Sequence, residues 1–324
     1  MVNALTTQIF LTIPLSFGSP AEKILDSEAL LECVTSVSCL VTQTSTGLIV
    51  GSLLFLVATG LTLIFGVLGI VNFAHGSLYM LGAYIALSAF RLTDSFIIAT
   101  AAGALGVGLF SLFFERFFMR RVYGADVLMQ LLVCYAFILI LDDAVKIIWG
   151  SEFQSMGMPA FFQEPPVFLA GGVIPVFYIY LIGIAAAMAI GLWILLNKTK
   201  IGKIVRAAAV NPSMTSALGL NTSLIFAGVF AFGGALAGLA GALAAPVRSM
   251  SPGMGFSVLI ESFIVTVIGG MGSVSGALVG ALIIGLIRSF GSIGFPYFIE
   301  GVMFITMAAI LVLKPSGIMG KETR

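Results

Sequence analysis

Charged residues are missing from long stretches of this chain. No Asp, Glu, Lys or Arg occurs between residues 33 and 90, a run of 58 residues (90 − 33 + 1). Four further runs without charge cover residues 95–114, 165–197, 207–247 and 262–287. A helix needs about 20 consecutive apolar residues to cross the hydrocarbon core of a bilayer. These runs therefore predict membrane-spanning helices, and the first is long enough for two.

The overall composition also indicates that lipid is the solvent. Charged residues make up 9% of the 324 residues and hydrophobic residues 60%, whereas an ordinary soluble domain carries about 25% charged residues. Too few polar side chains are present to cover the surface of a soluble protein of this size. A net charge of +1 and three cysteines further exclude a nucleic-acid-binding domain and a disulfide-rich scaffold. The sequence predicts an all-α, polytopic helical bundle in the membrane.

About eight or nine transmembrane helices are expected. The predicted spans are residues 47–69, 73–90, 95–114, 127–149, 175–196, 223–246, 257–271, 274–290 and 295–313. The seventh is short and ends in glycine, so we expect it to be tilted or partly re-entrant. By this division an N-terminal extension covers residues 1–44, the membrane domain residues 45–320, and a short tail residues 321–324.

The positions of the charges predict how the helices are oriented. Cytoplasmic loops of membrane proteins carry an excess of Lys and Arg. If segments 115–126, 197–222 and 314–324 lie inside, ten of the fifteen cations are cytoplasmic and eleven of the fourteen acids lie on the other side. The sequence therefore predicts a multi-pass protein whose C-terminus is cytoplasmic.

The N-terminal extension leaves alternatives open. Residues 1–18 contain an apolar stretch that is either a cleaved signal-like segment or an additional membrane-embedded helix. The acidic segment after it is expected outside, in an oxidising compartment. Cys33 and Cys39 can pair there, or they remain two unpaired small residues, because spacing alone does not fix the separation of their Cα atoms. Cys134 falls in an apolar helix and is expected to pack there.

Few residues offer the chemistry of an enzyme. The Gly-Lys pairs at 202–203 and 320–321 lack the spacing and the following Ser or Thr of a phosphate-binding loop. One histidine and no Cys/His cluster argue against a metal site. No catalytic residue and no metal ligand is predicted, and a self-contained enzyme is not expected.

Several ionisable residues fall near the outer ends of predicted spans. Asp142, Asp143 and Lys146 lie in the fourth, and Asp142 and Lys146 can pair because residues four apart share a helical face. Glu261 and Glu300 lie a few residues into the seventh and ninth. A proton-coupled carrier would place its acids near the bilayer midplane. Structural pairing, or the rim of an outward-facing vestibule, is therefore favoured over a proton relay.

Glycines recur every fourth residue in two of the predicted spans. Gly234 and Gly238 fall in the sixth, and Gly272, Gly276 and Gly280 in the eighth. Glycine at this spacing makes a smooth helical face on which another backbone can approach closely. We interpret these five residues as helix-packing positions.

Residues 60–84, GLTLIFGVLGIVNFAHGSLYMLGAY, contain a candidate helix break. Asn72 and His75 place polar groups between two apolar spans, and Gly76 follows them. Non-helical backbone at membrane depth persists only where protein or a water-filled cavity satisfies it, and broken helices often line transport pathways. The alternative is a tight inner turn in which Asn72 caps the second helix. Physical reasoning favours neither.

The longest predicted cytoplasmic loop, residues 198–221, is basic and rich in alanine. Asn211 followed by Pro212 is a helix-start signal, and Gly219 is a stop signal. One or two short amphipathic helices are expected along the membrane face. They either anchor the chain at the interface or dock a cytoplasmic partner.

Four segments together resemble a known family. They are NFAHGSLYMLGAY, RAAAVNPSMTSALGLN, FAFGGALAGLAGALAAP and ESFIVTVIGGMGSVSGALVGA. In this order they are similar to the permease subunits of branched-chain amino acid ABC importers, and the resemblance covers roughly residues 45–320. It implies a subunit of the prokaryotic inner membrane that pairs, within the lipid bilayer, with a second, homologous permease. It also implies two cytoplasmic ATP-binding subunits and an extracytoplasmic solute-binding protein, with ATP and Mg bound by the ATPases, no cofactor on this chain and no nucleic acid.

The resemblance implies roles for the candidate residues as well. The loop at 206–219 matches the coupling helices that contact the ATPases, with candidate residues Arg206, Ala207, Ala208, Asn211, Pro212 and Gly219. Importers of this class often begin that loop with Glu-Ala-Ala, so Arg206 puts a Glu-specific contact in doubt. Asn72, His75 and Gly76 become candidates for the translocation pathway. The implied solute is a branched-chain or other neutral amino acid; the alternatives are urea, short amides, aromatic acids, or an ion-coupled secondary carrier.

Overall fold

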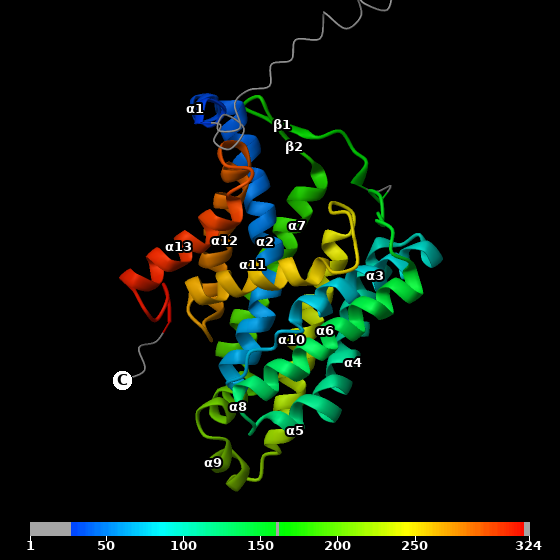
Figure 1. Ribbon diagram of the computed structural model, residues 1–324, viewed down its shortest axis with the longest axis vertical. Helices are drawn as coiled ribbons and strands as arrows, with labels where there is room; N and C mark the ends of the chain where they lie inside the picture. Colours follow the sequence, from blue (N-terminus) through cyan, green and yellow to red (C-terminus); the bar gives the residue numbers. More distant parts are fainter. Residues whose placement is uncertain (1–26, 160–161, 321–324) are drawn as a thin grey trace, which may run out of the picture.

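The computed structural model describes residues 27–159 and 162–320, and within them the chain is a bundle of helices (Figure 1). The alternatives for residues 1–18 and the proposed tail at 321–324 lie outside the described residues. The helices before the small hairpin are α1 Ser27–Thr35, α2 Val37–Leu68, α3 His75–Thr93, α4 Phe96–Phe114, the π-helical turn η1 Glu115–Met119, α5 Arg120–Val122 and α6 Val127–Trp149. The hairpin β1 Val167–Leu169 and β2 Gly172–Ile174 is antiparallel. It is followed by α7 Val176–Lys198, α8 Lys200–Val210, α9 Pro212–Ala217, α10 Thr222–Ala244, α11 Met254–Gly269, α12 Val274–Gly294 and α13 Ile299–Leu313.

Each of the nine predicted spans corresponds to a helix, so the predicted polytopic bundle is confirmed. By length and composition, five segments in the described part can cross a membrane: α2, the run Phe96–Val122, α7, α10 and α12. Helices α11 and α13 are shorter and apolar. Figure 1 shows α11 lying across the bundle while α2 runs along it. The seventh predicted span is therefore strongly tilted.

Helix α2 is the centre of the bundle, with α12, α10, α11 and α7 packed around it. Its middle section is almost completely buried, including Phe55, Ala58 and Leu61. The helix begins at Val37 rather than at residue 47, so the boundary predicted at residue 44 falls inside it. The early turns are polar, but their hydroxyl groups bond to carbonyls of the preceding turn, as Thr46 Oγ1 does to Thr42 O at 2.9 Å. These bonds let the helix continue beyond its apolar section.

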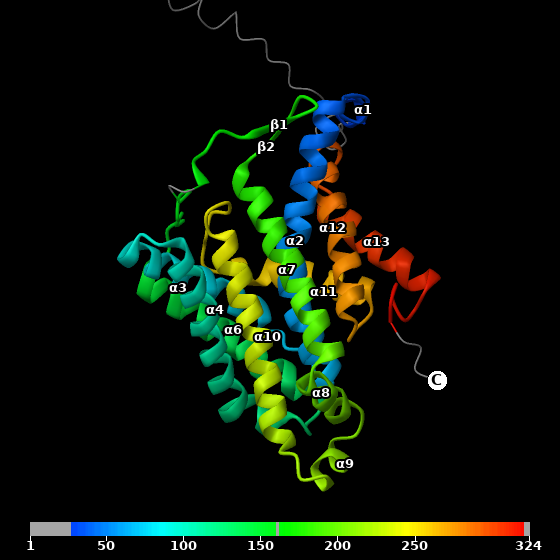
Figure 2. The same ribbon diagram turned by 180° about the vertical axis from the view of Figure 1, so that it is seen from behind.

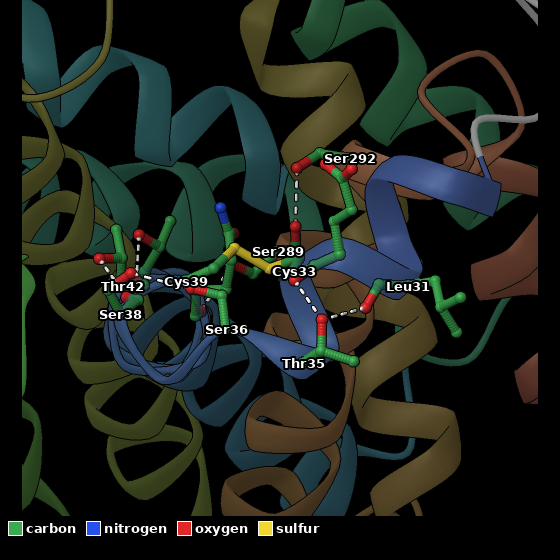
Figure 3. Close-up of a disulfide and its surroundings, with 12 residues drawn as sticks. Leu31, Cys33, Thr35, Ser36, Ser38, Cys39, Thr42, Ser289 and Ser292 are labelled. Carbon is green, nitrogen blue, oxygen red and sulfur yellow. Dashed lines mark hydrogen bonds between the residues drawn. A yellow bond between two sulfur atoms is a disulfide. The ribbon is translucent and has the colours of Figure 1, made fainter.

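A disulfide fixes the start of α2. Figure 3 shows the bond between Cys33 in α1 and Cys39 in the first turn of α2, whose Cα atoms are 5.1 Å apart. Of the two alternatives for these cysteines, pairing is thus the correct one. Ser289 of α12 donates a hydrogen bond to the carbonyl oxygen of Gln43 at 2.7 Å, so the same region also packs against α12. Cys134 is buried and unpaired, as predicted.

The disulfide provides a test of orientation. In a Cys33→Ser variant, the partly buried Cys39 becomes a free thiol. We expect it to react with a membrane-impermeant maleimide added outside intact cells, while the buried Cys134 stays unmodified until the protein is denatured. The wild-type protein should label only after reduction. Labelling of Cys39 that requires permeabilised cells would contradict the predicted orientation.

Two of the predicted packing glycines join α10 to α4. A Cβ atom on Gly238 would lie 2.6 Å from the Gly103 carbonyl oxygen and 2.7 Å from Val107 Cβ. Gly234, one turn earlier, faces the Ser111 side chain of α4. Because real Cβ atoms do not approach other atoms this closely, α10 can lie this near to α4 only with glycine at these two positions.

The glycines near the start of α12 have two different roles. Gly276 faces Gly269, and a Cβ atom on Gly280 would lie 2.7 Å from the Val265 carbonyl oxygen, so both bring α12 against α11. Gly272 is not in α12, contrary to the prediction. It lies in the preceding turn with a φ of 87°, a left-handed conformation that favours glycine. Gly272 is four residues before Gly276, so its spacing matches that of the helical glycines although its role is to form the turn.

Candidate functional site

The predicted helix break is present, and it lies deep in the bundle. Helix α2 ends at Leu68, residues 69–74 are not helical, and α3 begins at His75. His75 Nε2 lies 3.1 Å from the carbonyl oxygen of Val57. Val57 precedes the end of α2 by 11 residues (68 − 57), which at 1.5 Å per residue is about 16 Å along the helix. The chain therefore turns back after α2 and starts α3 beside the middle of that helix.

Asn72 stabilises this turn. Its Oδ1 accepts a hydrogen bond from the backbone nitrogen of Ala74 at 3.1 Å, and Cys134 Sγ lies 3.7 Å away. Asn72 and His75 are both fully buried. Within the described part of the chain, Asn72 Nδ2 and His75 Nδ1 have no hydrogen-bond partner. The break is thus a buried turn that Asn72 stabilises through the backbone nitrogen of Ala74, and Ala74, not Asn72, is the N-cap residue of α3.

Gly76 lies where the first turn of α3 meets the first turn of α11. Its backbone is in contact with Gly255, so the two helices approach without side chains between them. Asn72, His75 and Gly76 line none of the cavities described below. Their contacts support the helix break itself, and their part in a translocation pathway remains a prediction.

Two charged side chains pair between α11 and α12, at the half of the bundle nearer α1. Glu261 forms an ion pair with Arg288 and is 7% exposed. Glu261 therefore forms a structural ion pair, as favoured over a proton relay from the sequence. Nearby, Arg248 interacts with Tyr79 of α3, and both interact electrostatically with Glu261. The sequence drew attention to Glu261 but not to Tyr79, since one tyrosine in an apolar helix carries no pattern.

The pairing predicted between Asp142 and Lys146 is wrong. Lys146 Nζ instead lies 2.9 Å from Asp143 Oδ1, in an exposed pair three residues apart. This spacing also places two residues on the same helical face. Asp142 instead lies beside Gly253, in the segment before α11. The contact with the segment before α11 therefore decides which of the two acids meets the lysine.

Two cavities adjoin Arg248, and we call them the Arg248 cavities. The first has a volume of about 100 Å³ and lies between α2, α7 and α11, with mainly aliphatic walls. The second, of about 170 Å³, is lined in part by Ser249 and Ser257. Tyr79, Arg248 and Val258 line both. Arg248 thus lies between a mainly apolar cavity and a more polar one.

A third cavity, the α8 cavity, lies at the other half of the bundle. It has a volume of about 330 Å³ and is bounded by α2, α7, α8 and the turn before α12. Arg206 and Asn197 belong to its lining. Arg206 Nη1 donates to the carbonyl oxygen of Leu196 at 2.5 Å and to Asn197 Oδ1 at 3.2 Å. The residue that replaces a glutamate in the resemblance therefore joins α8 to the last turn of α7.

The loop at 198–221 forms two short helices, α8 and α9, as the sequence predicted. Thr199 caps α8 by accepting a hydrogen bond from the Gly202 nitrogen at 3.1 Å. Asn211 caps α9 in the same way through the Met214 nitrogen at 2.9 Å, Pro212 is the first residue of α9, and Gly219 follows it with a φ of 85°.

The surface of α8 and α9 is partly apolar. Ala208 is completely buried, whereas Ala207 and the polar ends of α9 are exposed. Three large apolar side chains also face outward: Val210, Met214 and Leu218 are 86%, 60% and 73% exposed. We call these three the α8–α9 apolar patch. Figure 2 shows α8 and α9 at the end of the bundle, below α7 and next to the lower end of α10.

Comparison with known proteins gives a consistent assignment. Residues 43–313 match the family described as "Branched-chain amino acid transport system / permease component". The chain is 32% identical, over 292 residues, to the "High-affinity branched-chain amino acid transport system permease protein BraD" of Pseudomonas aeruginosa, covering 86% of this chain and 95% of that protein. It is 29% identical over 297 residues to the similarly named LivH of Salmonella typhimurium, with the same coverage. A "Probable branched-chain amino acid transport permease protein LivH" of Methanocaldococcus jannaschii is 31% identical over 299 residues, covering 85% and 91% of the two chains. This multi-pass membrane protein therefore belongs to the family of permease components of branched-chain amino acid transport systems.

Proposed function

We propose that the chain is the transmembrane subunit of an ATP-driven importer that moves branched-chain or other neutral amino acids into the cell. The match of residues 43–313 to a permease family carries this proposal. In such an importer the chain sits in the prokaryotic inner membrane with its C-terminus inside. It pairs with a second, homologous permease and works with two cytoplasmic ATP-binding subunits and an external solute-binding protein. ATP and Mg belong to the ATP-binding subunits.

The geometry of α8 and α9 supports an ATPase-docking role. The α8–α9 apolar patch projects from the end of the bundle, where apolar side chains are suited to a protein partner. Arg206 attaches α8 to the end of α7. A movement imposed on α8 and α9 by ATP binding or hydrolysis would therefore move α7 as well. Closely packed helices shift between discrete arrangements, so a small displacement at the loop can be transmitted as a rigid-body motion.

The cavities support alternating access. Val50, Leu54 and Val57 of α2 line the smaller Arg248 cavity, whereas Thr62 and Gly66 line the α8 cavity. With 3.6 residues per turn, these two sets occupy different faces of α2. Helix α2 thus borders both the smaller Arg248 cavity, on the outward half of the bundle, and the α8 cavity, on the inward half. Repacking around α2 would close one as it opens the other.

A charge placed in the α8–α9 apolar patch tests the docking role. We expect Leu218→Asp to lower both uptake and solute-stimulated ATP hydrolysis at least about tenfold, because burying an unpaired carboxylate at an interface is costly. The side chain is 73% exposed, so the subunit itself should stay folded. Leu92→Asp is the matched control, since Leu92 is 85% exposed but lies at the end of α3, far from α8 in the sequence. Equal activity of the Leu218 variant and wild type would contradict the docking role.

Reconstitution tests the proposed function as a whole. The complete importer in proteoliposomes should accumulate leucine only with ATP on the ATPase side and the binding protein on the other. Ionophores that dissipate ion gradients should have no effect. Accumulation driven by an ion gradient without ATP would indicate a secondary carrier. Accumulation of urea, a short amide or an aromatic acid in place of leucine would indicate one of the other solutes.

A further inference from the structure

We propose that the Arg248 cavities are a solute-binding site within the permease, in which Arg248 binds the carboxylate of an aliphatic amino acid and the smaller cavity holds its branched side chain. This inference rests on the proposed function, because it assumes that the solute enters the bundle from the half nearer α1. It adds a chemical basis for selectivity within the membrane subunit.

Arg248 has the properties expected of an anion-binding residue. It is partly buried in a bundle that otherwise contains few charges, and it lines both cavities. Its neighbours include Tyr79, which also lines both cavities. In the described part of the chain Arg248 forms no ion pair. A guanidinium offers five N–H donors in a planar fork that matches a carboxylate, so several donors remain for a ligand.

The surrounding charges also favour an anionic group. Glu261 is the acid that interacts electrostatically with Arg248, but it is already paired with Arg288. Among these three side chains, two arginines share one glutamate, so Arg248 has no acid of its own. An isolated charge inside a membrane protein is costly and usually serves a binding function. A carboxylate in the cavities would compensate it.

The smaller cavity suits a branched hydrocarbon group. Its apolar walls consist mainly of β-branched and leucine side chains from two helices, with a volume of about 100 Å³: Ile49, Val50, Leu53, Leu54, Val57 and Val258. The larger cavity is lined also by Ser249 and Ser257, and serine hydroxyl groups can accept hydrogen bonds from an ammonium group. Arg248 lies between the two. The arrangement therefore offers separate places for the three parts of an aliphatic amino acid.

This chemistry discriminates among the alternative solutes. Urea and short amides carry no carboxylate, so they would leave Arg248 uncompensated. An amino acid with a small aliphatic side chain satisfies both the guanidinium and the apolar wall. The selectivity of the importer would then be set in part by this chain and not by the binding protein alone.

The first experiment removes the carboxylate partner. In the reconstituted importer, Arg248→Gln should lower kcat/KM for leucine uptake by roughly tenfold to hundredfold, the loss expected for a charge-assisted hydrogen bond. Tyr79→Phe should cause a smaller loss. The control is Arg91→Gln, which removes an exposed arginine that bonds to Gln154 at 2.7 Å and lines neither cavity. Binding-protein-stimulated ATP hydrolysis, measured without solute, should persist in the Arg248 variant and so report that the complex is folded and coupled.

The outcomes separate this inference from the proposed function. If the wild-type importer takes up no aliphatic amino acid, the proposed function fails. If the wild type takes up leucine and Arg248→Gln does so with the same kcat/KM, the inference fails while the proposed function stands. A loss of binding-protein-stimulated ATPase in Arg248→Gln, with the same loss in Arg248→Lys, would assign Arg248 to structure and would also overturn the inference.

A second experiment tests the aliphatic wall. Val50 is partly buried and lines the smaller cavity, so Val50→Phe should fill part of it without disturbing the core. Uptake of leucine should then fall more than uptake of valine, by at least about fivefold in the ratio of their kcat/KM values, because a pocket can distinguish one methylene by about 10-fold to 200-fold. The same binding protein serves both solutes, and the wild-type ratio is the control. An unchanged ratio would show that this cavity does not hold the side chain.

Discussion

A Glu261→Gln variant is expected to lose about 3–5 kcal/mol of folding free energy, although the two side chains have nearly the same shape. Glu261 is 7% exposed and pairs with Arg288 across α11 and α12. Glutamine removes the negative charge and leaves the arginine charge uncompensated in a low-dielectric environment. The free energy of unfolding, measured by denaturant titration in mixed micelles, should show the loss.

Two further variants decide whether the charge is the cause. Asp143→Asn breaks the other ion pair of the described residues, but that pair is exposed, so no measurable change in stability is expected. Replacing both Glu261 and Arg288 by Met should restore most of the stability, because a buried ion pair can often be exchanged for apolar residues of similar volume. If Glu261→Gln is as stable as Asp143→Asn, the pair does not stabilise the fold.

The pattern of charges predicted which segments cross the membrane, because that depends on local composition. It could not predict which charges meet. Glu261 and Arg288 are 27 residues apart (288 − 261), and they pair because α11 lies across the bundle beside α12. Arg248 and Tyr79 are brought together by contacts of α3 with α10 and α11. The partner of Lys146 could not be predicted either, although both candidate acids are close in the sequence. Asp142 and Asp143 can each reach its side of the helix, and Asp142 contacts the segment before α11 instead.

Helix ends are predicted where capping residues mark them, and they are missed where polar side chains let a helix continue. Asn211, Pro212 and Gly219 act through local hydrogen bonds and backbone conformation, so the sequence located α9 correctly. The start of α2 was missed because Ser and Thr can bond to carbonyls of their own helix, which hydropathy does not detect. Asn72 and His75 were found as polar residues at a break. The depth of that break follows only from the contact with Val57.

A Gly76→Val variant is expected to lose the folded state, with a destabilisation of about 3 kcal/mol or more. A Cβ atom at this position would meet the Gly255 carbonyl oxygen and lie 2.8 Å from Leu259 Cβ. The nearest atoms belong to the backbone of α11, which cannot rotate out of the way. Accommodation would require separating α3 from α11, and that contact is where the re-entrant turn after α2 is fixed. The yield of monodisperse protein after extraction and the thermal midpoint in detergent would measure the effect.

Gly191→Ala is the matched control, because it adds a methyl group at a helical glycine with open space around it. Nothing lies within 4 Å of the position that its Cβ atom would take in α7. Since alanine is favoured over glycine in a helix by about 1 kcal/mol, this variant should be as stable as wild type or slightly more stable. Gly76→Ala should fall between the two, because its single methyl group already meets Gly255. If Gly76→Ala gains stability as Gly191→Ala does, α3 and α11 are not in backbone contact, and the turn after α2 is held by Asn72 and His75 alone.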